Sequence, residues 1–94
     1  MRPYSTLAEA LERYGQEVTP HKKGRVSELN RIKVICRDPL TRQPMVTISS
    51  ADIATWRNSM TAQGLSPSTV RNRFAVVSQT FQVAAREWGF PPPG

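Results

Sequence analysis

The sequence predicts an all-α fold, a small four-helix bundle, and three observations lead to that prediction. Four segments carry apolar residues at the three- and four-residue spacing of a helix face, and none shows the sustained alternation of a β-strand. Three of these segments begin with a side-chain signal for a helix N-terminus. The chain has 94 residues, 38% of them hydrophobic, which suits one domain with a thin core and argues against a large enzyme.

The first helix is predicted to begin at Thr6, because Thr6 and Glu9 have the spacing of a capping box. The pair Thr19-Pro20 is predicted to end it. Its apolar residues recur at helical spacing and define one buried face, made of Leu7, Leu11, Tyr14 and Val18.

The second helix is predicted over about residues 23–37, up to Asp38-Pro39, because a residue that precedes proline avoids the α conformation. Residues 38–47 contain two prolines and are predicted to form a loop. The buried stripe of the second helix would consist of Val26, Leu29, Ile32 and Cys36.

The third and fourth helices have the clearest N-termini. Ser49 and Asp52 form a second capping box, and Ser66 is an N-cap followed by Pro67 in the first helical position. Gly64 and Gly89 are predicted to end the two helices. The third helix would bury Ile53, Trp56 and Met60, and the fourth Val70, Phe74, Val77, Phe81, Ala84 and Trp88. We expect a common core that contains Leu11, Leu29, Trp56, Phe74 and Phe81.

Positive charge is concentrated in two parts of the chain, residues 21–42 and residues 67–94. The net charge is +6, and residues 21–42 alone carry seven basic and two acidic side chains. This distribution favours a polyanionic partner, with double-stranded DNA as the first candidate. An ordinary solvated basic surface is the alternative explanation.

Several classes of site are excluded or disfavoured. A single cysteine, Cys36, and a single histidine, His21, exclude an internal disulfide and a Cys/His metal site. No cofactor motif and no catalytic set of side chains is recognisable, so the chain itself is predicted not to be an enzyme. It has no apolar run long enough for a membrane and no leader pattern, which predicts a soluble, cytoplasmic protein.

The polar faces of the second and fourth helices are the candidate DNA-binding surfaces. The second displays Asn30 and Val34 beside basic residues, and the fourth displays Asn72 and Gln79. Both mix side chains that read bases with side chains that bind phosphates. The predicted DNA-binding residues are Lys22, Lys23, Arg25, Ser27, Arg31, Ser68, Thr69, Arg71, Asn72 and Arg73.

Three segments carry a resemblance to a known family. They are residues 6–14, residues 46–53, and residues 64–73 together with Phe81, Ala84, Ala85 and Gly89. In this order they resemble the first, third and fourth helices of the core-binding domain of tyrosine recombinases, the phage-integrase family. Their order and spacing match over about residues 4–90.

The resemblance implies a SAM-like helical domain, residues 1–90, that forms one half of a clamp around DNA. Residues 91–94 would be a linker to a catalytic domain that carries an Arg/Lys/His/Arg set and a nucleophilic tyrosine, none of which can be placed on this chain. The parent would be a site-specific recombinase of bacterial or phage origin. Its partners would be double-stranded DNA and other integrase protomers.

Two other functions fit part of the sequence. Residues 62–70 also resemble the turn and recognition-helix start of a helix-turn-helix regulator, although the predicted fourth helix, about five turns long, exceeds a usual recognition helix. A helical protein-interaction module without a DNA role would instead require an exposed apolar patch.

Overall fold

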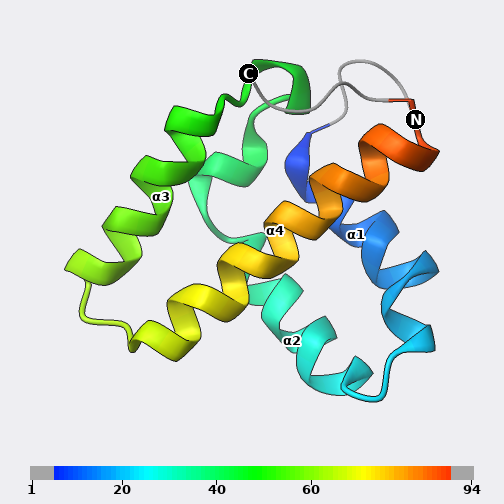
Figure 1. The fold of residues 1–94 in the computed structure, drawn as a ribbon, viewed down its shortest axis with the longest axis horizontal. Helices are drawn as coiled ribbons and strands as arrows, with labels where there is room; N and C mark the ends of the chain where they lie inside the picture. The colour runs from blue at the N-terminus through cyan, green and yellow to red at the C-terminus, as the bar shows by residue number, and fades with distance from the viewer. Residues whose placement is uncertain (1–5, 90–94) are drawn as a thin grey trace.

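The computed structural model describes residues 6–89 and shows four α-helices. These are α1 (Leu7–Glu17), α2 (Arg25–Ile35), α3 (Ser50–Ala62) and α4 (Pro67–Glu87). Three short 3₁₀-helices connect them: η1 (Thr19–His21), η2 (Pro39–Arg42) and η3 (Met45–Thr47). Helix α4 runs diagonally across the molecule, with α3 on one side and α1 and α2 on the other (Figure 1). The prediction of a small all-α bundle is confirmed.

The predicted starts of α1, α3 and α4 and the predicted end of α3 are confirmed, whereas α2 is shorter than the predicted range 23–37. At the start of α1, Thr6 Oγ1 accepts the N–H of Glu9 at 3.2 Å, and Ser49 Oγ accepts that of Asp52 at 3.1 Å before α3. In both cases the carboxylate accepts the N–H of the capping residue in return. Gly64 has φ +86° and donates to Thr61, while Leu65 donates to Met60, so a Schellman motif ends α3.

The segment predicted as a loop, residues 38–47, is part of the core. Its two 3₁₀-helices bury Leu40 and Met45, and Ile48 follows them into the interior. The N–H of Leu7 donates to the carbonyl of Gln43 at 3.1 Å, which fixes the segment against the start of α1. The prolines break the helical period here, so periodicity alone could not find these buried residues.

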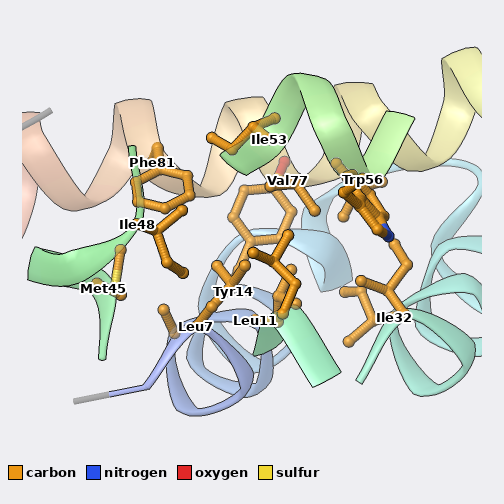
Figure 2. Close-up of a cluster of buried hydrophobic side chains, with 14 of the residues drawn as sticks. Leu7, Leu11, Tyr14, Ile32, Met45, Ile48, Ile53, Trp56, Val77 and Phe81 are labelled. Carbon is orange, nitrogen blue, oxygen red and sulfur yellow. The ribbon is translucent and has the colours of Figure 1, made fainter. Parts of the chain in front are cut away.

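The core lies beneath α4 and draws side chains from every helix. Figure 2 shows Leu11 and Tyr14 of α1 and Val77 of α4 in the middle of this cluster, with Phe81 of α4 toward one end and Trp56 of α3 toward the other. Gly15 allows α1 and α2 to approach closely, because a Cβ there would lie 3.2 Å from Cδ2 of Leu29. The predicted burial of Leu11, Trp56 and Phe81 is confirmed.

The predicted burial of three other residues is wrong. Val26 is 67% exposed and Leu29 37% exposed, because the first turns of α2 extend past the bundle; only Ile32 and Ile35 of α2 are buried. Phe74 is only half-buried and packs on the edge of the core, since α4 turns Val76 and Val77 inward instead.

Candidate nucleic-acid interface

A shallow groove of about 230 Å³ lies between α2 and α4. Helix α2 contributes four residues, each about one helical turn from another of the four along its groove side. Helix α4 contributes three residues from its first two turns. They are Ser27, Asn30, Arg31, Val34, Thr69, Asn72 and Arg73. Two asparagines, two arginines and two hydroxyl groups thus converge from segments far apart in the sequence, and no carboxylate lines the groove.

Local folding at the start of α4 positions its side of the groove. Ser66 Oγ accepts the N–H of Thr69 at 3.2 Å and donates to Thr69 Oγ1 at 2.9 Å. Pro67 occupies the first turn, where a missing N–H costs nothing. Asn72 and Arg73 follow one turn after Ser68 and Thr69, so the groove wall is built on a capped, regular helix.

The α2 side starts without a side-chain cap. Gly24 occupies the N-cap position, and Arg25 begins the helix. Ser27 and Asn30 are exposed and Arg31 is half-buried. Because Ile32 and Ile35 hold the second half of α2 in the core, the residues between and before them are directed to the surface.

Five of the ten predicted DNA-binding residues line this groove: Ser27, Arg31, Thr69, Asn72 and Arg73. Four others are exposed on the same two helices or just before α2 without lining it: Lys23, Arg25, Ser68 and Arg71. Within residues 6–89, none of the basic residues in these two sets forms an ion pair.

The tenth predicted residue, Lys22, lies in a partly buried polar network. Its Nζ donates to Tyr14 Oη at 2.7 Å, and to Glu28 Oε2 and Gln79 Oε1, each at 3.2 Å. Tyr14 Oη donates to the same Gln79 oxygen at 2.7 Å, and Thr19 Oγ1 donates to Glu28 Oε1 at 2.7 Å. The network joins α1, η1, α2 and α4, so the ammonium of Lys22 is already satisfied by the protein.

The network also affects the pKa of Lys22. Burial works to lower the pKa of this ammonium group, but the interactions with Tyr14 and Glu28 outweigh it and raise the pKa above its ordinary value. The ammonium group forms an ion pair with Glu28. Sequence reasoning placed Gln79 on an outward polar face and could not detect this partnership, because its members are up to 65 positions apart.

A second, larger hollow of about 680 Å³ lies on the opposite flank of α4, against α3. Its wall is mainly apolar, with Ile53, Phe74 and Phe81, and two arginines, Arg57 and Arg86, stand at it. The Arg57 guanidinium lies 5.7 Å from the centre of the Phe74 ring. The two hollows of α4 thus differ in chemistry, one polar and one apolar.

Cys36, directly after α2, is partly buried. Burial, with a contribution from the charge of Glu12, raises the pKa of the Cys36 thiol, which favours the unreactive protonated form. Within residues 6–89, no group of three or more potential metal ligands occurs. In the same range, no helix is long and apolar enough to cross a membrane.

Comparisons with known proteins point to one kind of relative. A shufflon-specific DNA recombinase of Escherichia coli is 37% identical over 91 residues, which cover 89% of this chain and 24% of that protein. Two Haemophilus influenzae proteins that carry the name integrase/recombinase are 26% and 32% identical over 96% and 94% of this chain. They are covered over 29% and 24% of their own lengths, so the chain spans about a quarter of these relatives. No family profile and no solved structure matches the chain.

Proposed function

Because the chain is integrase/recombinase-like over 89% of its length, we propose that it is a DNA-binding module of the core-binding type. It docks α2 and α4 on duplex DNA, in support of site-specific recombination by a larger protein. The chain itself contributes binding, and the strand-exchange chemistry belongs to a catalytic domain of that protein. Other protomers of the recombinase would be its partners on DNA.

The observation that carries this proposal is the polar groove between α2 and α4. Nucleic-acid-binding surfaces combine arginine with amide and hydroxyl side chains and lack carboxylates, and the groove has this composition. Arg31 and Arg73 approach it from different helices, so a phosphate or a guanine edge could be held from both sides.

The position of each predicted DNA-binding residue suggests its role in DNA binding. Lys23 and Arg25 are exposed at the start of α2 and are suited to phosphate contacts outside the groove, as is Arg71 on α4. Asn72 lies inside the groove and is suited to an adenine edge. Lys22 stabilises the helix arrangement through Glu28 and Tyr14 and adds positive potential without a direct phosphate contact.

The proposal is tested by arginine substitutions on the two flanks of α4. Arg31→Ala or Arg73→Ala should weaken duplex binding and reduce the slope of log K against log salt by about 0.9 if the lost contact is to a phosphate. Arg57→Ala and Arg86→Ala remove the same charge from the apolar hollow and serve as matched controls. Fluorescence anisotropy at low salt measures all four variants.

Equal losses for all four variants would mean that only net charge matters and would contradict a defined docking face. Unchanged binding in Arg31→Ala and Arg73→Ala would place the contact elsewhere on the molecule.

The apolar hollow between α3 and α4 supports a second candidate function, a protein-docking module. Its aromatic wall and its two arginines fit a partner segment that carries apolar side chains and carboxylates. This candidate predicts no salt-dependent duplex binding. A helix-turn-helix regulator is less compatible, because α4 has 21 residues and a recognition helix is usually shorter.

A further inference from the structure

Helix α2 exposes an unusual amount of apolar surface for a basic helix. Among residues 6–89, four large hydrophobic side chains are exposed, and three of them belong to α2: Val26 at 67%, Leu29 at 37% and Val34 at 38%. Single exposed apolar residues are common and need no explanation. Of these three, Val34 lines the candidate DNA-binding groove.

The three residues do not share one environment. Leu29 faces α1, where it packs beside Gly15. Val26, Asn30 and Val34 are spaced by four residues and therefore follow one line along the helix. Asn30 and Val34 line the α2–α4 groove with Asn72 of α4. The groove thus combines an exposed isopropyl group with two carboxamides.

This combination matches one base pair better than the others. In the major groove, thymine alone among the four bases presents a methyl group, and adenine presents the N7 acceptor and N6 donor that a carboxamide pairs with. A guanine–cytosine pair has no methyl group there and would leave the valine without that apolar contact. The surrounding arginines supply charge complementarity to the phosphates on either side.

We propose that the α2–α4 groove recognises A·T pairs in the major groove, with Val34 packed against the thymine methyl group and Asn30 or Asn72 on the adenine edge. Val26 lies about two turns before Val34 on the same line of α2 and contacts the flanking sugar. This inference rests on the proposed DNA-binding function and adds the base preference of the groove to it.

The test isolates the methyl group. Two duplexes of about 16 base pairs are compared, which exceeds the 35 Å longest extent of the molecule at about 3.4 Å per pair. One contains A·T pairs only, in a non-repeating order, and the other has deoxyuridine at every thymine position. Deoxyuridine keeps every hydrogen-bonding atom of thymine and lacks only the methyl group. Binding of the 94-residue chain is measured by NMR titration at low salt.

We expect the chain to bind the thymine duplex about fourfold more tightly than the deoxyuridine duplex, the effect of one buried methyl group. Val34→Ala should abolish that preference. Val46→Ala is the matched control, because Val46 is also an exposed valine, at 48%, and does not line the groove. It should keep the preference, which shows that loss of an exposed valine outside the groove has no effect. The loss in Val34→Ala alone then excludes a general effect of the methyl groups on DNA shape.

Three results would overturn the inference. Equal binding of both duplexes, with normal salt dependence, rejects the methyl contact and leaves the proposed function intact. A preference that persists in Val34→Ala places the methyl contact outside the groove. Absence of binding to either duplex rejects the inference and the proposed function together.

Discussion

Lys22 and Lys23 are adjacent in sequence but have opposite surroundings. Both belong to the basic stretch that predicts a polyanionic partner. Nζ of Lys22 reaches Tyr14, Glu28 and Gln79, whereas Lys23 is exposed and, within residues 6–89, has no ion-pair partner. Composition and spacing could predict the charge of this segment. They could not predict that one of the two charges is used inside the fold, because that depends on long-range packing.

Alanine substitutions should separate the two roles. Lys22→Ala leaves Glu28 and Gln79 without their ammonium donor, and we expect the free energy of unfolding to fall by about 1 kcal/mol, a value reduced for solvent exposure. Lys23→Ala should change stability by less than about 0.5 kcal/mol but reduce the salt dependence of DNA binding by about one phosphate contact. Urea denaturation and anisotropy titrations measure the two effects. The assignment is wrong if Lys22→Ala is as stable as the parent chain.

At the scale of elements, α4 follows the sequence pattern more closely than α2. The α4 stripe is continuous, and Val70, Val77, Phe81 and Ala84 are buried as predicted. The α2 pattern predicted a stripe from Val26 onward, but the bundle covers only the second half of that helix. A periodic pattern identifies a helix face and does not determine how far its neighbours extend. The same limitation hid the buried 3₁₀ segments, where prolines disrupt the period.

Two phenylalanines of α4 test this refined core. Phe81 is 4% exposed. Phe81→Ala should therefore lower the free energy of unfolding by roughly 3–5 kcal/mol, which is enough to unfold a domain of this size. Phe74 is half-buried at the apolar hollow. Phe74→Ala should therefore lower the free energy of unfolding by distinctly less than Phe81→Ala, and the variant should still show a cooperative thermal transition. Circular dichroism melting curves compare the two. A larger loss of stability in Phe74→Ala than in Phe81→Ala would contradict the observed difference in burial between the two side chains.

At the scale of the whole molecule, α4 separates two surfaces with different chemistry. The α2–α4 groove is polar and basic, and the α3–α4 hollow is apolar. The sequence predicted the helices that carry the polar surface and five of the residues that line it, because outward faces follow from inward ones. It did not predict the apolar hollow, which arises where α3 and α4 diverge and leave Phe74 partly uncovered.

The most direct test of the DNA-binding proposal is an NMR titration of the chain with duplex DNA at low salt, with every backbone amide observed. The account predicts salt-sensitive shift changes concentrated on residues 23–34 of α2 and its approach and on residues 66–73 at the start of α4. Amides of α3 around Arg57 should remain unchanged. Shift changes confined to the α3–α4 hollow, or no changes with any duplex, would contradict it.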